Sequence, residues 1–299
     1  TPQAARAGRG FDAPSGFALD PAAIDRAAAR FEERGHRVVV DPTCHSRHQR
    51  FAAADDERLA AVLRMAGNPH VDIAITLRGG YGWSRLLPRL DMTVLAASGT
   101  RWLWYSDFTA FALAALAQAR MTTWMGPVVS DFGAVAPSAF TVEHCVSLLE
   151  HTRYEVACAL EGPDVACAGT LWGGNLALVA HLVGTPFMPV VDGGIMFLED
   201  VGETPYRVER MLYQLHLAGI LARQQAILLG RFTEFALSDN DGCYDLDAAI
   251  AQIRSVCTTP ILTGLPFGHV RDKLTLPVGG RCALDVRAGA ATLGLSDHG

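Results

Sequence analysis

A serine stands at the junction between a predicted strand and a predicted helix. Ser106 follows the apolar run Trp102–Tyr105 and comes just before the apolar helical pattern of Phe108–Ala119. In such a tight turn the hydroxyl can project into a crevice, while the following backbone N–H groups and the helix dipole favour a developing oxyanion. A Ser-Asp pair before a helix is, however, more often an N-cap. The junction alone leaves both a nucleophile and a cap open.

An acid and a histidine farther along the chain could serve such a nucleophile. Glu199 and Asp200 end the apolar run Gly193–Leu198, where carboxylates are costly unless they are paired, hydrogen-bonded or placed at a cleft. His269 is reached through Gly268 in a predicted loop, and imidazole is well suited to general-base work near neutral pH. The alternatives are that one of the acids caps the following turn and that His269 is simply one of ten histidines.

Two glycine-rich turns could approach a ligand. Arg78, Gly79 and Gly80 follow the apolar run Val71–Leu77, and glycines there can present backbone N–H groups to negative charge. The segment matches neither the dinucleotide fingerprint nor the phosphate-binding loop, so a plain turn is the alternative. Gly173-Gly174-Asn175 opens an apolar helix, where close packing and capping by the asparagine explain the residues at least as well as ligand contact.

The cysteines and histidines do not predict a metal site. Cys44, His45 and His48 lack a fourth ligand, which favours a surface loop. The seven cysteines form no CxxC pair and are expected to behave as small buried hydrophobes in a reducing compartment. The first residues also lack the charged head and apolar stretch of a signal peptide. We therefore expect a cytoplasmic protein without a cofactor.

Composition excludes several classes of partner. A net charge of −6 without a cluster of Lys and Arg argues against nucleic acid, because that affinity comes from neutralising many phosphates. No apolar run reaches the roughly 20 residues that a membrane-spanning helix needs. Half of the residues are apolar and 19% are charged, which is typical of a globular protein.

The pattern of elements predicts an α/β fold in two domains, 1–150 and 151–299. In the first, helices and strands alternate, which indicates a parallel, doubly wound sheet whose crevice lies at the C-terminal ends of its strands. From about Thr152 the segments alternate in polarity, which suggests a β-rich domain with more antiparallel strand. The expected helices cover 22–34, 55–66, 108–119 and 210–218, and the expected strands 37–40, 71–77, 102–105, 155–160, 169–171, 226–230 and 261–262.

Taken together, six blocks in order resemble the LD-carboxypeptidases, the serine peptidases of family S66. The resemblance extends over nearly the whole chain from Ala13 onward, and its blocks are 77–87, 106–109, 126–127, 169–189, 195–215 and 265–277. It implies a flavodoxin-like N-terminal domain that carries the nucleophile and a β-rich C-terminal domain that carries the acid and the histidine. It also implies a homodimer.

The resemblance assigns roles to residues. It implies a catalytic triad of Ser106, His269 and Glu199, with an oxyanion site formed by the backbone N–H groups of Asp107 and Gly80. Gly79 and Arg78 would belong to the substrate-binding turn, and Arg78 is a possible anchor for the terminal carboxylate of a peptide.

The reaction that the family implies is hydrolysis of an L,D-peptide bond through an acyl-enzyme. The expected substrate is a small peptide, the cytoplasmic murein tetrapeptide, from which terminal D-Ala would be released during cell-wall recycling. Some members of the family instead cleave peptidyl or acyl-sulfamoyl adenylate antibiotics and give self-immunity. An alternative from another class is a non-catalytic protein that binds a small ligand on the same scaffold.

Two features depart from the family pattern. Trp104 stands two residues before the serine, where the family often has glycine, so it could alter the strain of the turn or narrow the pocket. The family's first buried strand should precede Ala13, yet Arg6–Asp12 is not apolar. Either the given start is not the natural one or that position in the sheet is poorly filled.

Overall fold

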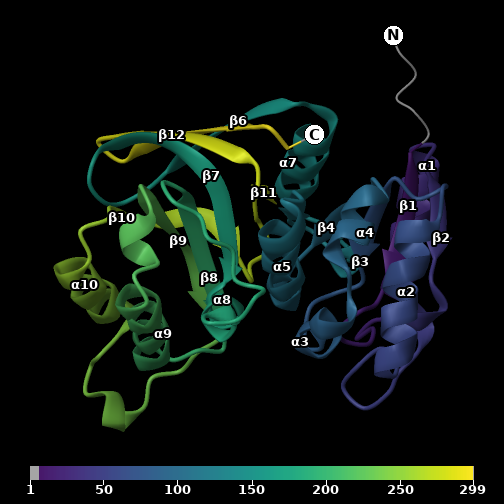
Figure 1. Ribbon diagram of the computed structural model, residues 1–299, viewed down its shortest axis with the longest axis horizontal. Coiled ribbons are helices and arrows are strands. Elements are labelled where there is room, and N and C mark those ends of the chain that lie inside the picture. Colours follow the sequence, from purple (N-terminus) through teal and green to yellow (C-terminus); the bar gives the residue numbers. More distant parts are fainter. Residues whose placement is uncertain (1–6, 299) are drawn as a thin grey trace. The chain divides into compact units, whose positions relative to one another are not determined.

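The computed structural model describes residues 7–298, and the chain divides into two compact units between Cys145 and Val146 (Figure 1). In the first unit, parallel strands lie side by side in the order β5-β4-β3-β1-β2. This is the flavodoxin-like strand order, so the predicted parallel sheet is confirmed. The strands are β1 (Gly8–Asp12), β2 (Arg37–Val40), β3 (Ile73–Thr76), β4 (Arg101–Trp104) and β5 (Thr123–Met125).

The connections of this unit contain its helices. The longer ones are α1 (Ala22–Glu33), α2 (Asp55–Gly67), α5 (Thr109–Ala119) and α7 (Ala139–Glu150), which continues into the second unit. The shorter ones are α3 (Trp83–Leu86), α4 (Met92–Ala97) and α6 (Val129–Phe132), with 3₁₀ turns η1 (Pro42–His45), η2 (Leu87–Arg89) and η3 (Ser106–Phe108).

Two of these helices show how the sequence pattern sets burial. In α1 the residues Ala23, Ile24, Ala27 and Phe31 recur at helical spacing and form its buried face, and the chain leaves the helix at Gly35 with φ +84°. In contrast, α5 is apolar nearly all round and buries seven consecutive residues from Thr109 to Ala115. It is therefore a core helix, and it places the serine turn that precedes it.

Strand β1 occupies the sheet position that the sequence suggested would be poorly filled. It lies between β2 and β3 although it contains two glycines. A Cβ atom at Gly8 would lie 1.6 Å from the backbone oxygen of His70, and one at Gly10 would lie 2.5 Å from Sδ of Met65. These contacts leave no room for side chains. The expectation of a poorly filled position is thus wrong, because close backbone packing replaces the missing apolar pattern.

Asp12, the last residue of β1, carries a buried acid. Its side chain is fully buried, and within residues 7–298 neither carboxylate oxygen has a hydrogen-bond partner. Burial, and then the charge of Asp41, raises the pKa of Asp12 well above its usual range, with a smaller opposing effect from its own backbone amide. The carboxyl group is therefore held in its neutral form more strongly than in the unfolded chain.

The second unit contains a mixed sheet in the order β10-β9-β8-β7-β12-β13-β6. Strands β7 (Val165–Asn175), β8 (Ile195–Val201), β9 (Ala226–Thr233) and β10 (Ile261–Gly268) run parallel. Strands β12 (Arg281–Arg287), β13 (Ala290–Ser296) and β6 (Arg153–Ala159) continue from β7 with antiparallel pairing. A short strand, β11 (Leu276–Val278), precedes β12.

The predicted excess of antiparallel strand holds for only one half of this sheet. The links between the parallel strands contain α8 (Leu176–Leu182), α9 (Pro205–Leu217) and α10 (Leu246–Val256), with η4 (Leu221–Arg223) and η5 (Asp239–Asp241). Parallel neighbours need such long crossovers, whereas antiparallel strands can be joined by a tight turn such as the one between β12 and β13. The helical links therefore account for the parallel half.

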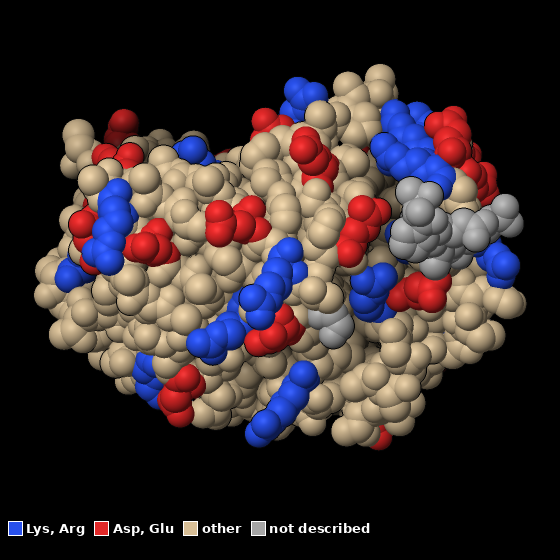
Figure 2. Space-filling view, turned by 90° about the horizontal axis from the view of Figure 1, so that it is seen from above, with Lys and Arg blue, Asp and Glu red and all other residues tan. Residues whose placement is uncertain are grey.

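Charge is dispersed over the surface seen in Figure 2. Basic and acidic side chains lie interspersed in small groups on a mostly uncharged face.

Among residues 7–298, every helix is too short or too polar to span a membrane.

We expect Asp12→Asn to make the protein more stable at neutral pH. Because the folded pKa of Asp12 is raised, its stabilising contribution is present at low pH and is lost as the pH rises through the folded value. Asparagine avoids that loss, so the gain should be at least about 1 kcal/mol at pH 8 and smaller at pH 5. Urea denaturation at both pH values measures it. A variant less stable than the parent at pH 8 would contradict this account of Asp12.

Candidate active site

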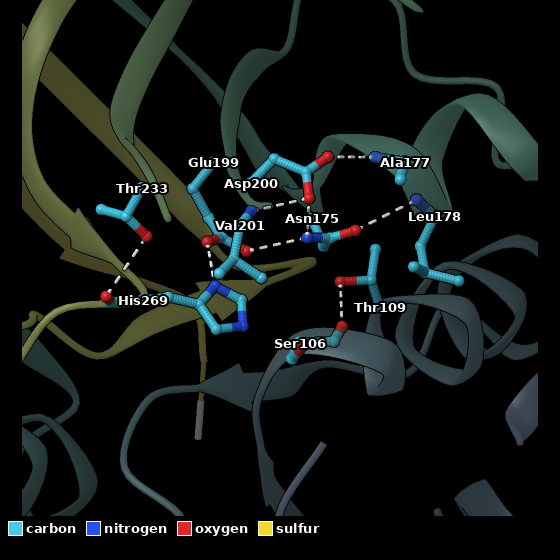
Figure 3. Close-up of polar contacts among 10 residues, drawn as sticks. All are labelled: Ser106, Thr109, Asn175, Ala177, Leu178, Glu199, Asp200, Val201, Thr233 and His269. Atoms are coloured by element: carbon cyan, nitrogen blue, oxygen red, sulfur yellow. Dashed lines mark hydrogen bonds and ion pairs between the residues drawn. The ribbon is translucent and has the colours of Figure 1, made fainter. Parts of the chain in front are cut away.

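The serine turn of the first unit has the backbone of a strained elbow. Ser106 follows β4 as the first residue of η3 and has φ +61°, a left-handed conformation that costs a non-glycine residue about 1–3 kcal/mol. The N-cap positions are Tyr105 for η3 and Phe108 for α5, so the interpretation of Ser106 as an N-cap is wrong. Thr109 Oγ1 donates to the Ser106 carbonyl oxygen at 2.7 Å and holds the turn (Figure 3).

The side chain of Asp107 holds the elbow in place through hydrogen bonds. Its buried carboxylate accepts hydrogen bonds from Ser15 Oγ at 2.8 Å and from the Trp83 backbone N–H at 3.2 Å. Burial raises the pKa of Asp107, and these two hydrogen bonds and the charges of Arg58 and Arg50 oppose the rise. The side chain thus ties the elbow to the segment that follows β1 and to the first residue of α3. The backbone N–H of Asp107 is the group for which the family resemblance implies a role in the oxyanion site.

The glycine turn after β3 lies directly against the serine. A Cβ atom at Gly79 would lie 2.5 Å from Cβ and 3.0 Å from Oγ of Ser106. Gly80 has φ +131°, which L-residues rarely adopt, and the Gly79 carbonyl accepts from the Gly16 N–H at 3.3 Å. The structure therefore brings together Ser106, Asp107 and the Gly79-Gly80 turn. Only glycine fits at Gly79 without moving the serine.

Trp104 does not narrow a pocket. Its side chain is fully buried, and its ring stacks on Phe108 with 5.7 Å between centroids. Phe108 in turn lies 4.8 Å from Phe111 of α5. The large residue that departs from the family pattern therefore belongs to the aromatic core under the elbow.

In the second unit, the predicted acid and histidine form a pair. Nδ1 of His269 lies 2.6 Å from Oε2 of Glu199 (Figure 3). Glu199 is fully buried, whereas the His269 side chain keeps 21% of its surface exposed. An N–H at Nδ1 that donates to the carboxylate leaves the lone pair of a neutral imidazole on Nε2. This is the tautomer that can accept a proton from a hydroxyl.

Irregular strand pairing brings the two side chains together. Leu198 and Asp200 of β8 pair with Leu229 and Phe232 of β9, so β9 has an extra residue opposite Glu199. The pairing of β10 with β9 also shifts between Thr263 and Gly268. Such bulges re-aim side chains near functional sites.

Two glycines make this irregular pairing possible. A Cβ atom at Gly230 of β9 would lie 2.4 Å from the backbone oxygen of Phe267. Gly268 has φ +141°, and a Cβ atom there would lie 2.8 Å from the Arg231 backbone oxygen. Because neither glycine has a side chain, β10 can lie close to β9 and place His269 beside Glu199.

Sequence reasoning missed the group that holds the other side of Glu199. Asn175 Nδ2 lies 3.4 Å from Glu199 Oε1 and 2.8 Å from Asp200 Oδ1, and Asn175 Oδ1 accepts from the Leu178 N–H. The predicted capping role of Asn175 is thus confirmed, and the same side chain also supports the acid. Gly173 serves close packing, since a Cβ atom there would lie 1.9 Å from the Phe197 carbonyl oxygen.

Asp200 belongs to this network. Its carboxylate accepts from the Ala177 N–H at 2.8 Å and from the Val201 N–H at 2.9 Å, besides Asn175. Asp200 therefore binds a backbone N–H at the N-terminus of α8. Only its hydrogen bond from Val201 corresponds to the predicted capping of the turn after β8. Burial raises the pKa of Asp200 to about 6, and the neighbouring charge of Glu199 adds to the rise, while the three hydrogen bonds oppose it.

The residues considered for metal binding do not form a cluster. Cys44 is buried in η1, whereas His45 and His48 are exposed. Across residues 7–298, no group of three or more His, Cys, Asp or Glu side chains is arranged to hold a metal ion. None of the seven cysteines, all of which are described, forms a disulfide.

Both units match the domains of one known protein family. Residues 10–126 match the model of the LD-carboxypeptidase N-terminal domain, and residues 168–284 match that of the C-terminal domain. The chain belongs to the LD-carboxypeptidase family. It is therefore a carboxypeptidase of the S66 serine peptidases, as its ordered motifs predicted.

Individual relatives match this chain over most or all of its length. A crystal structure of muramoyltetrapeptide carboxypeptidase from Oxalobacter formigenes is 45% identical, covers 97% of this chain and 99% of its own, and superimposes with a TM-score of 0.91. Murein tetrapeptide carboxypeptidase of Pseudomonas aeruginosa is 32% identical over 88% of both chains. The microcin C7 self immunity protein MccF shares the fold, with a TM-score of 0.89, 22% identity and coverage of 100% of this chain and 98% of its own.

We expect Gly79→Ala to reduce carboxypeptidase turnover by about 100-fold. The new methyl group overlaps Ser106, so Ser106 must move by a sizeable fraction of an ångström, and misplacements near 1 Å of a reacting group cost about that much. The matched control is Gly67→Ala, because a Cβ atom at Gly67 meets nothing within 4 Å. Steady-state kinetics and thermal denaturation of both variants test this. Full activity in Gly79→Ala would show that Ser106 does not need its present position.

The titration of Asp200 predicts how stability depends on pH. Because its folded pKa of about 6 exceeds the unfolded value of 3.8, its contribution is present below pH 4 and is lost as the pH rises through 6. The loss amounts to about 3 kcal/mol. Asp200→Asn has no such titration, so the difference in unfolding free energy between the two proteins should change by about that amount between pH 4 and pH 7. Urea denaturation measures it, and a constant difference would refute the assignment.

Proposed function

We propose that this chain hydrolyses the L,D-peptide bond of murein tetrapeptides and releases the terminal D-Ala. The contact between His269 Nδ1 and Glu199 Oε2 at 2.6 Å carries the proposal, because it prepares a general base in a family of serine carboxypeptidases. The 45% identical relative is named for action on a muramoyltetrapeptide, and the 32% identical one for action on a murein tetrapeptide. Both names support the same substrate.

In the proposed mechanism, Ser106, His269 and Glu199 act as a triad. His269 Nε2 takes the proton of the Ser106 hydroxyl as its oxygen bonds to the scissile carbonyl carbon, while Glu199 stabilises the imidazolium. The oxyanion is received by the backbone N–H groups of Asp107 and Gly80. His269 then gives its proton to the departing amine of D-Ala, and the carbon–nitrogen bond breaks. Water, deprotonated by the same histidine, hydrolyses the acyl-enzyme and restores Ser106.

The nucleophile and its base are assigned to different domains. We propose that residues 1–150 carry Ser106 and that residues 151–299 carry Glu199 and His269. The mechanism needs neither metal nor cofactor, because the histidine activates the hydroxyl. We further propose a cytoplasmic location, supported by cysteines that form no disulfide, and a homodimer, which the family implies.

Self-immunity hydrolysis of peptidyl or acyl-sulfamoyl adenylates is the second candidate. The same three residues would perform it, and the MccF structures share the fold. The identity of 45% to a muramoyltetrapeptide carboxypeptidase, against 22% to MccF, favours the murein substrate. Parallel assays on a tetrapeptide and on an aminoacyl sulfamoyl adenosine discriminate between them. The third possibility, a non-catalytic ligand-binding protein, does not fit a member of a carboxypeptidase family.

Substitution of Ser106 should abolish release of D-Ala. We expect Ser106→Ala to lower kcat by roughly 10⁴–10⁶-fold, and Glu199→Gln by about 10⁴-fold because the tautomer of His269 is no longer held. Ser106→Gly should be equally inactive but about 1 kcal/mol more stable than Ser106→Ala, because glycine relieves the positive φ. Mass detection of D-Ala and urea denaturation measure the two effects. Equal release from the parent and Ser106→Ala would remove the nucleophile assignment.

A further inference from the structure

Arginines surround two aromatic rings in the first unit, and they differ in whether an acid neutralises them. The guanidinium groups of Arg58 and Arg85 lie 4.7 Å and 4.9 Å from the centre of the Phe51 ring. Both bind the carboxylate of Asp55, Arg58 at 2.5 Å and Arg85 at 2.7 Å. The ring of Tyr81 lies beside that of Phe51, with 6.1 Å between centroids. These two arginines are therefore structural.

Arg50 and Arg78 have no such acid. Arg50 lies 5.8 Å from the centre of the Tyr81 ring, and Arg78 Nη1 reaches the Phe17 carbonyl oxygen only at 3.5 Å. Among residues 7–298 neither forms an ion pair. Burial lowers the pKa of Arg78, and the like charge of Arg50 lowers it further. The charge of Arg50 also acts on the buried Asp107, but that acid forms no ion pair with either arginine. Two cations near each other repel, and an anion between them would relieve this.

The position of Arg78 places this charge next to the nucleophile. Arg78 follows β3, beside β1, where the strand order of the sheet reverses and where such folds bind ligands. Its guanidinium lies beside Gly16 and near Gly80: a Cβ atom at Gly16 would meet Nη1 at 2.4 Å, and one at Gly80 at 3.8 Å. The adjoining Gly79 contacts Ser106. The cation and the serine thus flank the same two-residue turn.

The chemistry of a carboxypeptidase requires an anion site at this short range. In a substrate that ends in D-Ala, three bonds separate the scissile carbonyl carbon from the terminal carboxylate carbon. At about 1.3–1.5 Å per bond, the two carbons are within about 4 Å of each other. The residue that binds the carboxylate must therefore lie near the nucleophile, and Arg78 directly precedes Gly79, which contacts Ser106.

We propose that Arg78 and Arg50 together bind the free C-terminal carboxylate of the substrate. The inference rests on the proposed function and extends it, since it explains why the enzyme removes one residue from the end of a peptide. Arg78 supplies the inner, half-buried guanidinium, and Arg50 supplies the outer, exposed one. A peptide longer by one residue moves its carboxylate outward by about 3.5 Å and loses the inner contact.

Binding to an inactive protein tests the proposal without turnover. In the Ser106→Ala background, calorimetric titration compares a murein tetrapeptide with its C-terminal amide. We expect the acid to bind at least about 10-fold more tightly, since hydrogen bonds to charged groups are worth about 1.5–3 kcal/mol. Adding Arg50→Gln and Arg78→Gln should reduce the preference for the acid to about 3-fold or less. The control is Arg85→Gln, because Arg85 belongs to the same group of arginines but pairs with Asp55. This variant should retain the preference of the Ser106→Ala protein.

The outcomes separate this proposal from the proposed function. Equal binding of acid and amide by the Ser106→Ala protein would overturn the carboxylate site even if the active enzyme releases D-Ala. Absence of D-Ala release by the active enzyme would overturn the proposed function, while the binding comparison would still decide the carboxylate site. No binding of either peptide would reject the site. If the double substitution unfolds the protein, Arg50→Gln alone should lower the preference by at least about 3-fold.

Discussion

A fully buried carboxylate, that of Glu199, imposes the strongest requirement on the second unit. An ionised acid without water must receive hydrogen bonds on its oxygens, or burial makes it too costly. One oxygen meets His269 and the other meets Asn175. Satisfying the acid therefore also orients the imidazole, so stability and the orientation of His269 depend on the same contacts.

These contacts in turn determine the backbone around them. Asn175 must stand opposite Glu199, which the pairing of β7 with β8 ensures. His269 must come from a third strand, which requires the shifted pairing of β9 and β10 and the absence of side chains at Gly230 and Gly268. The first unit shows the same principle on a smaller scale. There the strained φ of Ser106 persists because Asp107, Thr109 and Gly79 hold the turn from three sides.

The sequence predicts those parts of the molecule that depend on local pattern. The helical spacing of α1 and the glycine beyond its end predicted that helix well, and the first sheet followed from alternating elements. Helix α9 begins at Pro205, five residues before its predicted start, although proline in the first turn is itself a start signal. The pairing of Glu199 with His269 was expected from family motifs, since no local pattern links residues 70 positions apart.

Other features depend on which strands become neighbours, and one sequence does not reveal that. The contacts of Asn175 with two acids follow from strand register, so only its local capping role was predictable. The glycines of β1 looked like a defect because their value lies in the nearness of His70 and Met65. The parallel half of the second sheet was not predicted, because one sequence does not reveal which strands pair.

The amide of Asn175 is a chemically labile group within this hydrogen-bond network. Asparagine is among the thermolabile residues, and hydrolysis of its side chain yields aspartate. At this position the product would set a third carboxylate beside Glu199 and Asp200 and remove the donor that both now share. Chemical ageing at one atom would thereby remove the hydrogen bonds that both acids receive, while the aspartate could still cap α8.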